Sequence, residues 1–203
     1  MKKAILFALI FFVSFGFLIS SHYQTEKKLE LKAEQPILIT SCGQSPGPVM
    51  VKVFLKKLDL EYDLNPLATA ENLIAKKEAG TPYGSVIIVM GASLKGMGAA
   101  GISIDDEIDR IKNLIQEAKS HGITVIGAHI EGMKRRAQGA AVGDNTDELS
   151  IDAVAPNSDF MIINKDGNTD NRFTIIATEK NISMIEIEKN MELLQTFEKI
   201  YQK

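Results

Sequence analysis

The sequence predicts a three-layer α/β domain in which helices cover both faces of a mostly parallel, doubly wound sheet. Short apolar segments rich in Val and Ile alternate along the chain with segments of helical periodicity. Parallel neighbours need a crossover connection, and such crossovers are right-handed, so the alternation favours a parallel sheet covered on both sides. Six predicted strands in 203 residues suit an open flavodoxin-like or Rossmann-like sheet better than a closed barrel.

The first half of the domain contains three predicted strands and two helices. Ile37–Thr40 is a short apolar run between Pro36 and Gly43, typical of a strand buried on both faces. Pro48 starts a helix, because proline is tolerated in the first turn, where its missing N–H would be unpaired anyway. A weaker strand, a second helix and the strongest strand follow at Glu61–Asn65, Leu67–Ala79 and Val86–Met90.

The second half contains the longest helix. Ser103 and Asp106 form a capping box at its start, and His121-Gly122 ends it. Its apolar stripe, with residues spaced by three or four, is Ile104, Ile108, Ile111, Ile115 and Ala118. The remaining strands are Ile123–Ile130, Phe160–Ile163 and Ile182–Ile187, and the remaining helices are Thr146–Ala155, a segment around Phe173–Ala177, and Met191–Tyr201.

We expect the flavodoxin-like strand order 2-1-3-4-5, with the sixth strand at an edge. In this order the loops after the first and third strands flank the point where the order reverses, and ligands bind there, outside the carboxyl ends of the strands. Composition agrees with one ordinary domain over residues 36–203, since 45% of residues are hydrophobic and only 6 are proline. The net charge of -3 predicts no nucleic-acid partner.

The N-terminus predicts export. Residues 1–21 begin with two lysines and continue as an almost wholly apolar run, the pattern of an export signal, and residues 22–35 form a polar tether. Ile19 stands where a small residue is preferred before a cut after Ser21, so retention of residues 4–20 as a membrane anchor remains an alternative. We expect a periplasmic or extracellular domain that meets the membrane only through this segment.

Three loops are predicted at the carboxyl end of the sheet: residues 41–47, 91–101 and 131–144. The helix at Pro48 has no carboxylate in its first turn, so its N-terminus can hold an anion, whereas the helix after Ser103 already carries three acidic residues there. A small anionic metabolite is the expected ligand. The predicted ligand-binding residues are Gly43, Gln44, Ser45, Gly47, Ser93, Lys95, Gly96, Gly98, His129, Arg135 and Arg136.

Cofactor and metal chemistry find little support. Gly96, Gly98 and Gly101 approach a dinucleotide fingerprint, but they follow the third strand and lack an acidic partner on a second strand, so a tight turn and close helix packing are the favoured interpretation. We leave the cofactor unknown. No acidic pair has spacing that indicates metal ligation, and neither a Walker loop nor a G-x-S-x-G elbow is present.

Cys42 and His129 both stand at predicted strand ends, where they could meet as a nucleophile and a base. The alternative is a small buried thiol and a histidine that bonds to its own neighbours. A phosphatase-type loop would place an arginine six residues after the cysteine, and that position is Pro48. As the only cysteine, Cys42 forms no intramolecular disulfide.

Three segments carry a family resemblance: P-I-L-I-T-S-C-G-Q-S from Pro36, M-G-A-S-L-K-G-M-G-A-A-G-I from Met90 and H-I-E-G-M-K-R-R from His129. In this order behind an export signal, they resemble an uncharacterised family of bacterial exported domains of unknown function. The resemblance covers residues 36–203. It implies that the three loops matter and supplies no activity or catalytic residues.

These observations leave three hypotheses open. The leading one is an extracytoplasmic domain that binds a small anionic metabolite through the three loops. The second is a hydrolase or transferase in the same cleft, and the third is a module of an envelope complex that docks a protein partner and holds no ligand.

Overall fold

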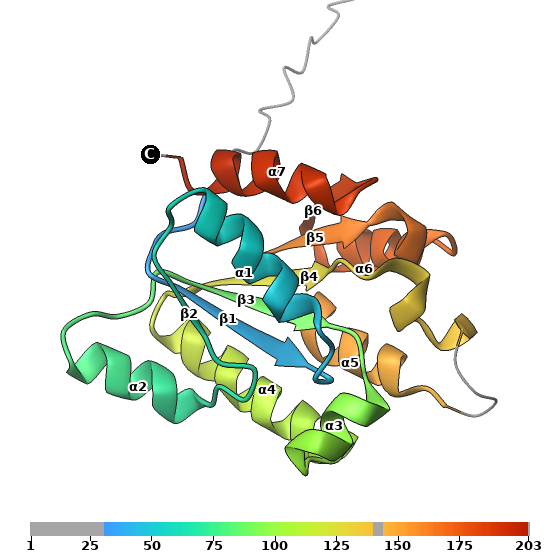
Figure 1. The fold of residues 1–203 in the computed structure, drawn as a ribbon, viewed down its shortest axis with the longest axis horizontal. Helices are drawn as coiled ribbons and strands as arrows, with labels where there is room; N and C mark the ends of the chain where they lie inside the picture. Colours follow the sequence, from blue (N-terminus) through green and yellow to red (C-terminus); the bar gives the residue numbers. More distant parts are fainter. Residues whose placement is uncertain (1–30, 140–143, 203) are drawn as a thin grey trace, which may run out of the picture.

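The computed structural model describes residues 31–139 and 144–202, and within them six strands form one parallel sheet. The observed order β2-β1-β3-β4-β5-β6 confirms the predicted flavodoxin-like arrangement with the sixth strand at an edge (Figure 1). The strands are β1 (Ile37–Cys42), β2 (Tyr62–Leu64), β3 (Ser85–Met90), β4 (Thr124–His129), β5 (Phe160–Asn164) and β6 (Ser183–Ile187).

Helices connect the strands and cover both faces of the sheet. The α-helices are α1 (Gly47–Lys57), α2 (Ala70–Glu78), α3 (Leu94–Ala100), α4 (Ile104–Ser120), α5 (Thr146–Val154), α6 (Arg172–Lys180) and α7 (Leu193–Ile200). Short 3₁₀ helices are η1 (Gly132–Arg135), η2 (Ala137–Gly139), η3 (Ala155–Asn157), η4 (Lys165–Asn168) and η5 (Asn190–Glu192). The prediction of a loop at residues 91–101 was therefore wrong for most of its length, because Leu94–Ala100 form helix α3.

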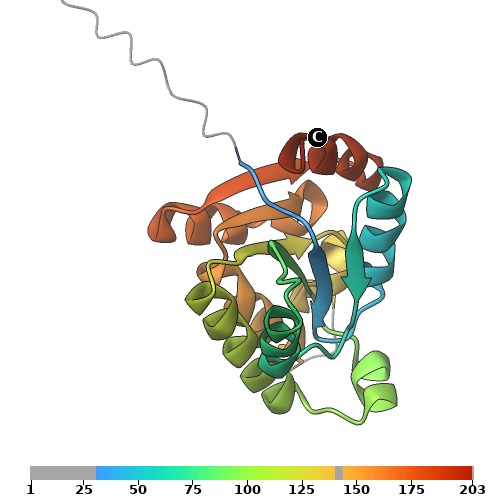
Figure 2. The same cartoon turned by 90° about the vertical axis from the view of Figure 1, so that its left-hand side faces the viewer.

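The sheet separates two hydrophobic cores. Ile37 and Ile39 point to the face covered by α1 and α7, while Leu38 points to the opposite face, which packs against α4, α5 and α6 (Figures 1 and 2). Every residue of β1 and β3 is buried, as expected for central strands of a parallel sheet. The carboxyl ends of the strands are therefore the natural place for a site.

Helix α4 has the predicted cap and the predicted apolar stripe. The Ser103 hydroxyl accepts a hydrogen bond from the Asp106 N–H at 3.1 Å, and the Ser103 N–H donates to the Asp106 carboxylate at 3.3 Å. Ile111, Ile115 and Ala118 are buried against the sheet. Periodicity and capping together determine where this helix lies.

The two ends of the described chain lie beside one another at the amino end of the sheet (Figure 2). The Ala33 N–H donates to the Ile200 carbonyl at 3.1 Å. The predicted export signal and most of the tether precede Leu31 and lie outside the described residues. Within the two described ranges no helix is both long and apolar enough to span a membrane.

Candidate functional site

The point where the strand order reverses is filled by the chain itself. Gln44 and Ala92 form an antiparallel bridge between the loops after β1 and β3, and the Ser93 N–H donates to the Gly43 carbonyl at 2.7 Å. Gly43 has a φ of +105°, and a Cβ there would lie 2.6 Å from the Ala92 Cα. Only glycine fits this close approach, so the two loops seal the expected ligand position.

A buried carboxylate holds the loop after β1 in place. Glu107 is fully buried, and its Oε1 accepts hydrogen bonds from the Gly43 N–H and the Gln44 side chain, each at 2.8 Å. Arg110 pairs with Glu107 at 2.9 Å and donates to the Ser41 carbonyl at 2.6 Å. The Gly43 N–H and the Gln44 side chain, which we expected to bind a ligand, therefore bond to Glu107 instead. Neither Glu107 nor Arg110 was among the residues predicted for the site.

The N-terminus of α1 also faces a carboxylate. The Gly47 N–H donates to the Ser45 hydroxyl at 3.3 Å, and a Cβ on Gly47 would lie 2.9 Å from Glu131 Oε2. The Glu131 side chain is only 9% exposed, and this oxygen has no hydrogen-bond partner among the described residues. A negative charge complements a helix N-terminus, so Glu131 occupies the position that we expected an anion to take.

The two arginines of the third loop form internal contacts rather than an open anion site. Arg135 donates to the Ala92 carbonyl at 3.0 Å and to Glu131 at 3.2 Å. Arg136 is 2% exposed and pairs with Glu148 at 2.8 Å and Asp170 at 2.6 Å. Its guanidinium holds the pKa of Asp170 at about 2. Arg135 therefore connects the segment after β4 to the loop after β3, and Arg136 connects it to α5 and to the loop before α6.

Helix α3 carries the predicted residues of the second loop. The Ser93 hydroxyl caps it by accepting a hydrogen bond from the Gly96 N–H at 3.1 Å. Gly96 packs against the Gln44 carbonyl, while Gly98 faces open space and Lys95 is exposed. Gly96 therefore lets α3 pack closely against the Gln44 backbone, whereas no neighbouring atom requires a glycine at Gly98.

Cys42 and His129 do not meet. They stand on strands separated by β3, which places them about 10 Å apart at the usual strand spacing. Burial raises the pKa of the Cys42 thiol to about 12 and lowers the pKa of His129. His129 shares a hydrogen bond of 3.0 Å with the Arg135 carbonyl, and its ring packs on Phe173. A nucleophile and base pair therefore does not form between them.

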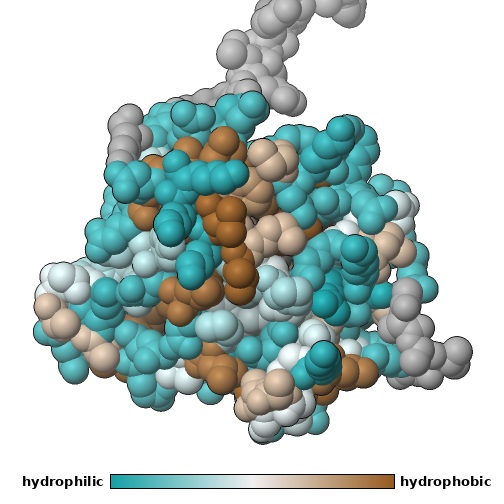
Figure 3. All heavy atoms as spheres, in the orientation of Figure 1, coloured by the Kyte–Doolittle hydropathy of each residue, from teal (hydrophilic) through white to brown (hydrophobic). Residues whose placement is uncertain are grey.

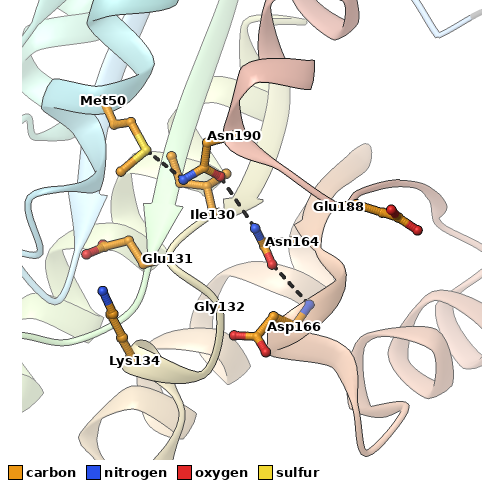
Figure 4. A pocket seen from close by; sticks show the side chains of 9 residues that line it. All are labelled: Met50, Ile130, Glu131, Gly132, Lys134, Asn164, Asp166, Glu188 and Asn190. Atoms are coloured by element: carbon orange, nitrogen blue, oxygen red, sulfur yellow. Dashed lines mark hydrogen bonds between the residues drawn. The ribbon is translucent and has the colours of Figure 1, made fainter.

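A cavity of about 350 Å³ opens at the carboxyl ends of β4, β5 and β6, beside α1 (Figure 4). Three carboxylates, two carboxamides and one lysine supply its polar groups. Its lining residues are Met50, Ile130, Glu131, Gly132, Lys134, Asn164, Asp166, Glu188 and Asn190. None of the eleven residues named individually as ligand-binding lines the cavity. Glu131, Gly132 and Lys134 do belong to the predicted loop 131–144, and the cavity lies at the predicted end of the sheet.

Hydrogen bonds orient the cavity wall. Figure 4 shows a chain of contacts from Met50 through Asn190 and Asn164 to the Asp166 N–H, which donates to the Asn164 carboxamide at 3.0 Å. The Asp166 carboxylate accepts a hydrogen bond from the Met133 N–H at 3.0 Å. Asn164 and Asp166 follow a predicted strand directly, which was the available signal for this site.

The carboxylates of the wall do not form a recognisable metal centre. Within the described residues, no group of three or more His, Cys, Asp or Glu side chains is arranged to hold a metal ion. Gly132 has a φ of +62°, and a Cβ there would meet the Asp166 carboxylate at 2.6 Å. The turn after β4 therefore needs glycine to bring Asp166 and Glu131 to the same cavity.

Three solved structures are among those similar to this chain. A lipolytic protein of the G-D-S-L family from Desulfitobacterium hafniense DCB-2 has a TM-score of 0.35 and 16% identity, covering 74% of this chain and 75% of that chain. The psychrotrophic esterase EstA from Pseudoalteromonas sp. has a TM-score of 0.35 and 12% identity, with 74% and 76% covered. A GDSL-like lipase from Bacteroides thetaiotaomicron VPI-5482 has a TM-score of 0.33 and 15% identity, with 76% and 71% covered.

The sequence comparisons give a family and no characterised relative. No curated protein matches the chain. The family model that matches spans residues 34–201, which includes all three segments on which the resemblance was based. The chain belongs to the family described as a domain of unknown function, DUF6305.

Proposed function

We propose that this domain is an exported small-molecule-binding module, and that its ligand occupies the cavity at the carboxyl ends of β4, β5 and β6. The observation that carries the proposal is a cavity of about 350 Å³ lined by an excess of carboxylates. Ligand pockets in proteins begin near this volume and favour the carboxyl edge of open α/β sheets. Export rests on the apolar N-terminal segment.

The charges of the wall favour a ligand with at least one positive charge. Arg135 pairs with Glu131 and Lys165 pairs with Glu188, both from outside the lining. Asp166 is therefore the carboxylate of the wall that has no ion pair among the described residues, and it would attract a cation and repel an anion. The sequence favoured an anion because the first turn of α1 contains no carboxylate, but Glu131 supplies one from another segment. An amine or a zwitterion bearing an amine fits this arrangement better than a phosphate or a dicarboxylate.

Binding is better supported than catalysis. The lining residues contain carboxylates and amides but no Ser, Thr, Cys or His, so no side chain of the usual acyl-transfer type lies at the cavity. Cys42 and His129 are both buried in the sheet, away from the cavity lining. An acyl-transfer hydrolase would therefore have no hydroxyl, thiol or imidazole nucleophile among the lining residues of this cavity.

The test is titration calorimetry of the purified protein with four probes: putrescine, lysine, succinate and inorganic phosphate. We expect saturable binding of an amine-bearing probe and none of the two anions. Asp166→Asn should weaken that binding by about fivefold, the usual worth of one partly exposed ion pair. Asp105→Asn, an exposed change at the start of α4, is the matched control and should leave the affinity unchanged.

A charge change of opposite sign sharpens the result. Lys134→Ala removes the one lysine of the wall and should strengthen binding of the cationic probe. If the wild type bound succinate or phosphate and Lys134→Ala lost that binding, the ligand would be an anion and the proposed cationic class would be wrong. An affinity that neither Asp166→Asn nor Lys134→Ala alters would place the ligand elsewhere and overturn the site.

A further inference from the structure

The outer face of α1 exposes apolar side chains. Val49 and Val53 are one turn apart and are 54% and 46% exposed, while Val51, Phe54 and Leu55 on the other face are buried. Figure 3 shows a narrow hydrophobic band over α1 with hydrophilic side chains around it. The outer face of α1 thus exposes two apolar side chains that packing against the sheet does not account for.

Lysines flank this exposed band. Lys52, Lys56 and Lys57 belong to α1, the helix contains no acidic residue, and none of the three lysines forms an ion pair with another described residue. The nearest acidic residues along the chain, Asp59 and Glu61, follow the helix end. Exposed apolar side chains bordered by lysines are typical of helices that lie on anionic lipid surfaces.

The tether enters the fold beside the lysine end of α1. Gln35 accepts a hydrogen bond from the Glu61 N–H at 2.6 Å, just after the helix, and Leu31 and Ala33 pack against the core that α1 and α7 share. Residues 21–32 span at most about 40 Å when fully extended. A membrane that holds residues 4–20 would therefore lie within reach of α1, and the short tether would raise the local concentration of lipid.

We propose that α1 docks the domain onto an anionic lipid surface through Val49 and Val53, with Lys52, Lys56 and Lys57 binding the head groups. A second copy of the chain fits the same face less well, because a twofold contact between identical α1 faces would bring the two sets of lysines together. The sequence alone predicted membrane contact only through the N-terminal segment, so α1 would add a second one.

The test uses tryptophan fluorescence, because the chain contains no tryptophan. The full chain carrying Val53→Trp is reconstituted into vesicles of phosphatidylcholine with or without phosphatidylglycerol, each containing brominated lipid as a quencher. We expect a blue shift and quenching only in the anionic vesicles. Ile175→Trp is the matched control, since Ile175 is 51% exposed on α6, across the sheet, and should stay unquenched in both.

The lysines provide the second arm of the experiment. Combining Val53→Trp with Lys52→Glu, Lys56→Glu and Lys57→Glu should abolish the quenching, because each lysine contributes about a fivefold effect near an anionic surface. Val49→Trp repeats the measurement from the preceding turn. Equal quenching in both vesicle types, no quenching in either, or a blue shift that grows with protein concentration in lipid-free detergent would overturn the proposal, the last by showing self-association.

Discussion

Glu107 and Arg110 form a buried ion pair beside the reversal point of the sheet, with side chains 0% and 8% exposed. Through Glu107 the pair binds the Gly43 N–H and the Gln44 side chain, and through Arg110 it binds the Ser41 carbonyl. Every one of these bonds joins α4 to the end of β1. The pair therefore sets the position of the loop after β1, and removing one member leaves the other without its counter-charge.

Arg110→Met should destabilise the protein by about 3–5 kcal/mol, because it leaves the fully buried Glu107 carboxylate unpaired. Urea unfolding of the variant and the wild type measures the difference. Asp105→Asn, two positions before Glu107 on the exposed side of α4, should change stability by less than about 0.5 kcal/mol. A loss below about 1 kcal/mol in Arg110→Met would show that the pair is not needed to hold the loop.

His129 gives the protein a pH dependence with a definite sign. Burial lowers the pKa of His129, so the folded state keeps it neutral where the unfolded chain already binds a proton. Its contribution is fully present above about pH 6.5, the ordinary histidine value, and stability is lost as the pH falls below that value towards the folded pKa. The slope reaches at most about 1.4 kcal/mol per pH unit.

His129→Leu should flatten this slope below about pH 6.5, as measured by urea unfolding at several pH values. Ile163→Val serves as the control, because Ile163 is the buried register neighbour of His129 on β5 and its replacement removes no titrating group. If His129→Leu and Ile163→Val show the same slope as the wild type, the histidine does not cause the acid sensitivity.

At the scale of elements, α3 shows how two glycines of one short helix differ. A Cβ on Gly96 would lie 2.1 Å from the Gln44 carbonyl oxygen, whereas a Cβ on Gly98 would meet no atom within 4 Å. The Gln44 backbone cannot easily retreat, because its bridge to Ala92 holds it. The same substitution should therefore have opposite effects at the two positions.

Gly96→Ala should destabilise the protein by about 1–3 kcal/mol, the usual cost of overpacking. Gly98→Ala should stabilise it by roughly 0.5–1 kcal/mol, because alanine is the better helix former and nothing opposes it. Thermal unfolding of both variants measures the difference in sign. A fall in melting temperature for Gly98→Ala equal to that of Gly96→Ala would contradict the assignment of α3.

Local patterns in the sequence predicted the strands and helix α4, because a strand buried on both faces is a short continuous apolar run and a surface helix has an apolar stripe spaced by three or four residues. The order of the sheet was predicted from the flavodoxin-like arrangement that such an alternation favours. Local patterns did not predict α3, since its glycines are weak helix formers, and the Ser93 cap and the burial of Met97 compensate for them. The end of the sheet that holds the cavity was predicted. Its lining was predicted only for the loop 131–144, because the other walls come from distant segments: Met50 and Asn190, for example, are 140 positions apart in the sequence.

The same limit applies to the charges. Sequence spacing showed that α1 lacks an acidic first turn, but no spacing could show that Glu131 would reach that helix start from the segment after β4. Arg136 likewise looks unpaired in sequence, because its partners Glu148 and Asp170 are 12 and 34 positions away and reach it only in the folded chain. Long-range pairing of this kind decides whether a basic residue faces a ligand or the protein.

For the whole molecule, the two ends of the described chain form a closed junction. The Ala33 N–H donates to the Ile200 carbonyl, the Ser85 hydroxyl donates to the Glu34 carbonyl at 2.8 Å, and the Tyr201 hydroxyl lies 3.0 Å from that same Ser85 oxygen. Tyr201 is 4% exposed. The segment before β1 and the end of α7 therefore complete the core together. We expect this contact to contribute more to stability than an unbroken backbone in an exposed surface loop.

A circular permutant tests that conclusion. A flexible linker of about six residues joins residue 202 to residue 31, and new ends are placed between Gly80 and Thr81, which are exposed and lie between α2 and β3. We expect cooperative thermal unfolding with a melting temperature within a few degrees of the wild type, because Gly80 and Thr81 are exposed and the cut leaves the buried Tyr83 attached to β3. Opening the chain between Gly127 and Ala128, inside the buried strand β4, should abolish folding, since it interrupts hydrogen bonds to both neighbouring strands. If the permutant opened at Gly80 failed to fold as completely as the one opened inside β4, the junction of the two ends would not be sufficient to close the core.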